Sequence, residues 1–336
     1  MKVSVICITY NQAPFIAKAI EGILMQETDF EYEIVINDDA STDGTTEIVK
    51  KYAELYPEKI KAVLHEENQF SKGVPFSKIL NLDKLQGEYI AICEGDDYWT
   101  DKKKLQIQVD FLDKHKDYSG CFHASMRKDG NTFNDIRVFP SRKERLYKTT
   151  FSIKDIGKGY FIETCSVMYR FKPYKEELIS FFPGRIINAD SYLIGYFAAK
   201  GKLKYIDRIM SVKIISNIGV WNNPEQTIDD KYTRFAYEIV NVVKEYGLMM
   251  QKLNKEKYNT FKVSDALPEV LISLYRNKQF DKISDIIHEF YPYFYEDYKK
   301  DKKLFDKTSK RYIRIKYGVL ISLIFNIILL IYIIFK

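Results

Sequence analysis

The first half of the chain alternates short apolar runs with stretches whose apolar residues recur at helical spacing. The apolar runs predict strands at Val3–Thr9, Tyr32–Asn37, Ile60–Leu64, Tyr89–Cys93 and Ser119–Ala124. Helices are predicted between them at Ala13–Gln26, Thr45–Leu55 and Lys102–Lys114. Regular alternation of strand and helix predicts an α/β fold, with a mixed, mostly parallel sheet of the Rossmann type and helices on both faces.

The second half changes character twice. Residues 125–160 are more polar and irregular, and further strands (Phe161–Tyr169, Leu203–Ile206, Ile209–Ile215) and one helix (Asp190–Lys200) follow. Beyond about Asn222 the pattern turns helical, with helices predicted at Ile228–Gly247, Ala266–Asn277 and Lys282–Phe290. We therefore expect a catalytic domain at 1–222 and a helical appendage at 223–298.

The C-terminal end has the pattern of a membrane anchor. Residues 317–335 contain no charged side chain, and a membrane-spanning helix needs about 20 apolar residues. The preceding segment, 299–316, contains nine Lys or Arg and only two Asp, and positive flanks stay on the cytoplasmic side. We expect a basic juxtamembrane segment, one transmembrane helix and a catalytic domain on the cytoplasmic side of the cytoplasmic membrane. A buried core helix, or a tail buried in a partner membrane protein, are the alternatives.

Charge and cysteine content exclude several classes of partner and site. The formal net charge is +6, but the C-terminal tail holds more than this excess, and no basic patch with interleaved aromatics precedes it, so we expect no nucleic-acid partner. Four cysteines are scattered among apolar runs without any pair at metal-ligand spacing. This is typical of buried free thiols in a reducing compartment, and it argues against a disulfide framework or a zinc site. The oligomeric state is left open.

Polar clusters follow three of the predicted strands. Thr9, Tyr10 and Asn11 end the first strand, residues 37–44 (NDDASTDG) end the second, and residues 94–97 (EGDD) end the fourth. In open parallel sheets, ligands bind at the carboxyl ends of the strands. The three clusters therefore predict one concave site at this edge of the sheet.

The cluster at 94–97 has the chemistry of a metal site. Glu94, Asp96 and Asp97 repel one another unless a cation or hydrogen-bond donors compensate their charges. A hard divalent cation takes carboxylate oxygens and keeps positions open for phosphate oxygens. Gly95 would allow a tight turn that aims two acids at one point. A solvated acidic turn that caps the next helix is the alternative.

The segment at 38–45 (DDASTDGT) suits a nucleotide. Asp and Ser at a strand end can bond a nucleobase or ribose hydroxyls. Ser41 and Asp43 are also good N-cap residues for the following helix, and both roles can hold together. Asp38 and Asp39 exceed what one cap requires.

Three blocks in this order carry a family resemblance: TYNQAPFIAKAIEGILMQ, IVINDDASTDGTTEIV and GEYIAICEGDDYWTDKKKLQIQVDFL. They resemble the family-2 glycosyltransferases of the GT-A fold, closely over about residues 2–115 and more loosely to about 221. The resemblance implies a nucleotide-sugar donor, usually a uridine diphosphate sugar, and a divalent metal, Mn²⁺ or Mg²⁺. It implies nucleotide binding by Thr9, Tyr10, Asn11, Asp38 and Asp39, with support from Ser41 and Asp43. The family's Asp-x-Asp metal motif reads Glu94-x-Asp96 here, and Asp97 extends it.

The same resemblance extends to the catalytic base. Residues 186–194 (IINADSYLI) resemble a family segment in which a helix-initiating Asp is the general base of inverting members, which implies that role for Asp190; a simple helix cap is the alternative. Residues 212–221 (VKIISNIGVW) resemble a stretch that usually carries Arg and His, and Lys213 and Ser216 stand there instead. The processive-synthase motif Q-x-x-R-W is absent, which favours transfer of one sugar per encounter.

Four side chains are candidates for the donor or acceptor pocket. Thr164, Trp99 and Trp221 could line it, or they could be ordinary packing residues. Lys213 is the fourth candidate, because it or a neighbour must replace the family's His if a diphosphate contact depends on that His. The expected reaction is a metal-dependent, inverting single displacement onto a hydroxyl of a membrane-associated glycan or lipid-linked acceptor. A catalytically inactive, membrane-tethered binding subunit is the main competing hypothesis. A nucleotidyltransferase is a second one, although the chain lacks the Gly-rich basic loop that such enzymes carry near the N-terminus.

Overall fold

The computed structural model describes residues 1–141, 148–156, 162–182, 189–216, 236–255 and 263–304. The chain divides into two compact units, residues 1–223 and 224–336, which are described separately. The predicted anchor at 317–335, most of the basic segment before it and Trp221 lie outside the described residues.

The first unit is built from strands and helices in alternation. Its strands are β1 (Val3–Thr9), β2 (Tyr32–Asp38), β3 (Ile60–Leu64), β4 (Tyr89–Ile92), β5 (Tyr98–Trp99), β6 (Tyr118–Asp129), β7 (Asp135–Phe139), β8 (Thr150–Phe151), β9 (Met168–Arg170) and β10 (Lys202–Ile215). Its α-helices are α1 (Ala13–Leu24), α2 (Thr45–Leu55), α3 (Phe76–Ile79), α4 (Lys104–Lys114), α6 (Ile153–Ile156), α7 (Lys175–Phe181) and α8 (Ala189–Lys200). Short 3₁₀ turns lie at Leu82–Lys84, Thr164–Ser166 and Lys172–Tyr174.

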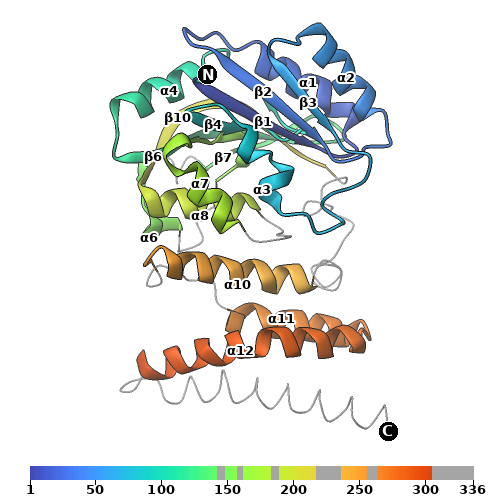
Figure 1. Ribbon diagram of the computed structural model, residues 1–336, viewed down its shortest axis with the longest axis vertical. Helices are drawn as coiled ribbons and strands as arrows, with labels where there is room; N and C mark the ends of the chain where they lie inside the picture. The colour runs from blue at the N-terminus through green and yellow to red at the C-terminus, as the bar shows by residue number, and fades with distance from the viewer. Residues whose placement is uncertain (142–147, 157–161, 183–188, 217–235, 256–262, 305–336) are drawn as a thin grey trace. The chain divides into compact units, whose positions relative to one another are not determined.

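The ten described strands belong to one mixed sheet, part of which is labelled in Figure 1. The strand order is β3-β2-β1-β4-β9-β6-β10-β5, with β7 attached to β6 and β8 attached to β10. The strands β3, β2, β1 and β4 are parallel to one another, as are β6 and β10. Strand β9 runs antiparallel to both β4 and β6 and so joins the two parallel groups. The sheet is therefore mixed, and the parallel half is the part that carries the predicted site.

The core lies between the parallel strands and the helices α1, α2 and α4. Val3, Val5 and Cys7 alternate along β1 on the face that packs against Ile16 and Ile20 of α1. Buried residues thus recur at every second position along β1 and at helical spacing along α1, as the sequence pattern predicts. All four cysteines are buried and free, which confirms the expectation of unpaired thiols.

Several predicted elements match closely, and others were wrong. Strands β1 and β3 and helix α2 have the predicted bounds. A strand was predicted at 161–169, but its described residues form a 3₁₀ turn at Thr164–Ser166, and the short strand β9 begins only at Met168. The segment after 124 was expected to be irregular, but β6 continues to Asp129 and pairs with β7. The two strands predicted at 203–206 and 209–215 form the single strand β10, with irregular pairing between Ile206 and Ile209.

The second unit contains three described helices, α10 (Ala236–Lys252), α11 (Val263–Arg276) and α12 (Phe280–Leu304). Their apolar faces form a separate core that includes Val240, Leu271, Ile283 and Phe290. The predicted helical region is therefore confirmed for these residues. No helix among the described residues is long and apolar enough to cross a membrane.

Candidate active site

Strand register brings the predicted polar clusters to one edge of the sheet. Strands β1 and β2 pair with Thr9 opposite Asp38, and β4 lies parallel to β1 on its other side with Ile92 opposite Ile6. The loops that follow these three strands therefore start side by side. This is the arrangement that a single site at the carboxyl edge of the sheet requires.

The loop after β1 is bonded directly to the loop after β2. The backbone N–H of Asn11 donates to Ser41 Oγ at 2.9 Å, and the N–H of Thr42 donates to Asn11 Oδ1 at 2.8 Å. Asp43 accepts from the N–H of Ala13 at 3.0 Å and from Thr45 Oγ1 at 2.6 Å. These side chains therefore hold the two loops in one shape. The N-cap of α2 is Gly44, which makes no side-chain cap bond, so the prediction that Ser41 or Asp43 takes this position was wrong.

The aspartate pair is buried and fully engaged. Asp38 is 1% exposed and accepts hydrogen bonds from the hydroxyls of Ser41 and Thr46. Asp39 accepts from the backbone N–H of Gln69 at 2.6 Å and of Phe70 at 3.1 Å. Asp39 therefore ties a third loop, after β3, to the site, a link that sequence spacing could not reveal.

The acidic turn after β4 is seated on the end of β1. The N–H of Gly95 donates to the carbonyl of Ile8 at 2.8 Å. A Cβ at Gly95 would lie 2.5 Å from Gln12 Oε1 and 2.7 Å from Thr9 Oγ1. The predicted tight turn is present, since the N–H of Asp97 donates to the carbonyl of Glu94 at 3.0 Å. The φ of Gly95 is not positive, so the glycine is needed for the close approach to β1 and not for a left-handed backbone. Thr9 is 1% exposed and lies beneath this turn, whereas Tyr10 is 48% exposed and open to a ligand.

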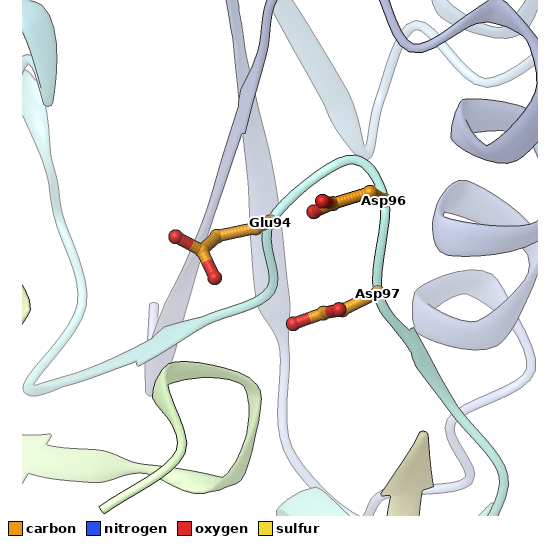
Figure 2. Close-up of side chains that lie close together, drawn as sticks. All are labelled: Glu94, Asp96 and Asp97. Carbon is orange, nitrogen blue, oxygen red and sulfur yellow. The ribbon is translucent and has the colours of Figure 1, made fainter. Parts of the chain in front are cut away.

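The three carboxylates of the turn converge. Glu94, Asp96 and Asp97 each present an oxygen within 4.8 Å of the others. Figure 2 shows Asp96 and Asp97 pointing in the same direction from the turn, towards the side on which the Glu94 carboxylate lies. Burial raises the pKa of Asp96, and the charge of Glu94 adds to this effect. Oxygen donors in this arrangement suit a hard divalent cation.

Lys213 of β10 reaches into this cluster. Its Nζ lies 2.9 Å from Glu94 Oε2 and 3.0 Å from Asp97 Oδ2. Asp97 is completely buried, and its other oxygen accepts from the N–H of Ile214 at 3.0 Å. Burial by itself would lower the pKa of Lys213, but the charges of Asp97 and Glu94 outweigh it and raise the pKa well above its usual value. Lys213 is therefore a mostly buried ammonium, and Asp97 is held by Lys213 and the backbone of Ile214.

Asp190 lies in the first turn of α8, within the electrostatic reach of the acidic turn. Burial and the charge of Glu94 raise the pKa of Asp190 to about 6, while Lys213 and the N–H of Ser191 act in the opposite direction. A carboxylate with this pKa is ionised at neutral pH and is a stronger base than an ordinary aspartate. The position and the basicity both suit a general base.

Sequence reasoning missed a second buried carboxylate near Asp190. Glu163 is 3% exposed and pairs with Arg127, whose Nε lies 2.6 Å from Glu163 Oε1. Its charge also contributes to the raised pKa of Asp190. An acid directly before Thr164 was the only available signal, and the pairing with Arg127 depends on the tertiary fold.

The pocket candidates have different positions. Trp99 is 2% exposed, and its Nε1 donates to the carbonyl of Cys165 at 2.9 Å, so it fills the core and does not line an open pocket. Thr164 is half-buried in a 3₁₀ turn. Ser216, where the resembling family usually has a His, is buried against Gly130. Trp221 lies outside the described residues.

Comparison with known proteins gives a family match. The family described as "Glycosyl transferase family 2" matches residues 4–178. An uncharacterized protein of Mycobacterium tuberculosis is 33% identical over 222 residues, which cover 66% of this chain and 60% of that protein. An uncharacterized glycosyltransferase of Nostoc is 35% identical over 210 residues, which cover 61% of this chain and 62% of that protein. This chain thus spans about 60% of the length of the curated relatives it matches.

Solved structures support the fold. Staphylococcus aureus TarS 1-349 in complex with UDP aligns with a TM-score of 0.53 at 22% identity, over 82% of this chain and 72% of that one. A mannosyltransferase from Pyrobaculum calidifontis in complex with GDP-Man and Mn²⁺ aligns with a TM-score of 0.50 at 20% identity, over 83% of this chain and 75% of that one. At these identities the likeness shows a shared architecture.

Proposed function

This chain belongs to glycosyl transferase family 2, and on that premise we propose that it transfers one sugar from a nucleotide diphosphate sugar to an acceptor hydroxyl with inversion at the anomeric carbon. The observation that carries the proposal is the assembly of the acidic turn, the bonded loops after β1 and β2, and the raised pKa of Asp190 at one edge of the sheet.

Uridine diphosphate sugars are the proposed donors. The loops after β1 and β2 present Tyr10, Asn11 and Ser41 at the carboxyl edge of β1 and β2, and Tyr10 is exposed enough to contact a base. The structural relative TarS is described in complex with UDP and with UDP-GlcNAc. The exposed Tyr10 and the TarS complexes are the support for this class of donor.

The acidic turn fits a divalent cation through two of its residues. Glu94 and Asp96 are partly exposed oxygen donors, whereas Asp97 is held by Lys213 and Ile214. We assign Mn²⁺ or Mg²⁺ to Glu94 and Asp96. A cation bound there would neutralise the negative charge of the diphosphate.

The chemical step needs a base on the acceptor side. An Asp190 carboxylate oxygen takes the proton of the acceptor hydroxyl as that oxygen forms a bond to the anomeric carbon. The bond between the anomeric carbon and the diphosphate oxygen breaks, and the nucleotide diphosphate leaves with the electron pair. Attack from the opposite face inverts the configuration. The pKa of about 6 keeps Asp190 ready to accept a proton at neutral pH.

The C-terminal sequence is the support for a proposed acceptor and location. We propose that the uncharged segment 317–335 anchors the chain in the cytoplasmic membrane and that the basic segment 299–316 faces anionic headgroups on the cytoplasmic side. A domain held at the bilayer would meet a lipid-linked or membrane-associated glycan. The relative TarS is named a poly(ribitol-phosphate) β-N-acetylglucosaminyltransferase, which agrees with a polymeric acceptor.

A second candidate function is an inactive binding subunit. Its support is that Lys213 already engages two of the three acids and that Ser216 stands where the family usually has a His. Such a subunit would bind nucleotide-sugar but would not release nucleotide.

A donor screen tests the proposal. The detergent-purified full chain would be incubated with UDP-, GDP- and dTDP-sugars and Mn²⁺, with and without EDTA, and nucleotide release would be measured beside nucleotide binding. Asp190→Asn and Asp96→Ala serve as variants, and Asp110→Asn, an exposed acid of α4, as the matched control.

Three results decide between the hypotheses. Metal-dependent release from one donor, lost in Asp190→Asn and Asp96→Ala but kept in Asp110→Asn, supports the transferase. Binding without release, even in the presence of membrane extracts that contain acceptors, supports the inactive subunit. Absence of binding to every donor contradicts both.

A further inference from the structure

Lys213 forms an ion pair with one of the acids that a metal ion in this site would need as a ligand. Its Nζ lies 2.9 Å from Glu94 Oε2, and Glu94 is one of the two acids available to a cation. Its partner Asp97 is completely buried, and the Lys213 side chain is itself only 15% exposed. This is not a mobile surface lysine, so its charge is a fixed part of the acidic turn.

The strand holds Lys213 in this direction. Val212 and Ile214, its neighbours on β10, point to the opposite face and pack with Phe15 and Tyr98 in a separate apolar cluster. Because successive side chains on a strand point to opposite faces, packing of these two neighbours aims Lys213 at the acids. Val212 also pairs with Tyr98, the residue after Asp97, which fixes β10 beside the acidic turn.

We propose that Lys213 is a tethered counter-cation that competes with the divalent metal for Glu94, so that the empty enzyme binds metal weakly and takes it up together with the nucleotide diphosphate. This inference deepens the proposed function and rests on it.

Electrostatics give the order of binding. Without the donor, a divalent cation at Glu94 must either displace the Lys213 ammonium or lie close to its positive charge in a site of low exposure. Either requirement weakens metal binding. The donor brings a diphosphate, whose oxygens can bind both the cation and the ammonium. The two positive charges then no longer depend on the same carboxylate, so metal and nucleotide should each strengthen the binding of the other.

The test measures metal binding without any activity. Free Mn²⁺ would be titrated by electron paramagnetic resonance against the full chain in detergent, with and without UDP. Lys213→Met removes the charge and keeps the length of the side chain. Lys18→Met is the matched control, because Lys18 carries the same charge and lies 4.0 Å above the ring of Tyr98, on the other face of the β5–β10 ladder.

A second pair of variants guards against misfolding, since Lys213→Met leaves Asp97 as a buried unpaired charge. Asp97→Asn removes that charge, and its side-chain oxygen can still accept from the N–H of Ile214. The comparison of Asp97→Asn with Asp97→Asn/Lys213→Met then reports the effect of Lys213 on Glu94 alone.

We expect Mn²⁺ to bind about tenfold or more tightly when Lys213 is lost, in either background, as the removal of a close like charge predicts. Lys18→Met should leave the affinity unchanged. UDP should increase Mn²⁺ affinity more in the wild type than in Lys213→Met.

Unchanged or weaker Mn²⁺ binding in both Lys213 variants would overturn the inference, and tight binding by the wild type without UDP would do the same. These outcomes leave the proposed function standing as long as UDP binds. Absence of UDP binding in every form would instead count against the proposed function itself.

Discussion

Substitution of Gly95 by alanine tests whether the acidic turn must sit directly on the end of β1. A Cβ at this position would lie 2.8 Å from Thr9 Cβ and 2.7 Å from Thr9 Oγ1, where ordinary contacts begin at 3.4 Å. Gln12 Oε1, at 2.5 Å, is the end of a flexible side chain and can move away. Thr9 cannot move away as easily, because it belongs to a central strand that pairs on both sides.

The magnitude follows from these distances. To relieve the contact with Thr9 Cβ the turn must lift by about 0.6 Å, the difference between 2.8 Å and 3.4 Å. Overpacking of this kind costs about 1–3 kcal/mol of folding stability. Because a displacement of about 1 Å can cost about 100-fold in rate, we expect nucleotide release to fall by roughly tenfold or more.

The assay compares Gly95→Ala with Gly201→Ala. A Cβ at Gly201 would lie 2.9 Å from the backbone N of Ser119, so it causes a similar clash at the opposite, amino-terminal edge of β10. Urea unfolding measures the stability of each variant, and nucleotide release from the active donor measures its rate per folded molecule. Both variants should lose stability, but only Gly95→Ala should lose activity. Equal rates in the two variants would refute the claim that this contact positions the acids.

Three further predictions concern buried carboxylates. Asp190→Asn should abolish nucleotide release while leaving UDP binding intact. In the wild type the rate should fall as the pH drops through about 6, because the base becomes protonated, and a flat profile between pH 5 and 8 would contradict the role. Glu33→Gln should lower the folding stability at pH 7 and weaken the dependence of stability on pH below about pH 4.5. Burial raises the pKa of Glu33, but its ion pair and hydrogen bonds outweigh burial and lower the pKa, so the stabilisation by Glu33 is lost as the pH falls. Urea unfolding midpoints measured against pH test this prediction. Asp39→Ala should weaken UDP binding and increase proteolysis near Gln69 and Phe70, whose N–H groups lose their acceptor; unchanged cleavage would show that the bonds are not needed to hold that loop.

Much of the parallel half of the sheet was determined by local sequence. Apolar periodicity alone predicts strands β1 and β3 and helix α2. Each of these elements buries either one face or a continuous apolar run against elements that are close in sequence. The acids at 94–97 could be recognised for a similar reason, since a short turn places side chains of adjacent residues together whatever the rest of the fold does.

Tertiary structure decided which of these residues are free to act. Lys213 meets Glu94 across 119 residues, and Asp39 holds backbone groups 30 residues away. The same is true of Gly95, whose importance lies in the approach of another strand and not in its own backbone angles. Chain composition and spacing fix what chemistry each segment can offer, but charge pairing and close contact depend on distances in space. Those distances are set by strand register and by the packing of the whole sheet, which no single segment of the sequence contains.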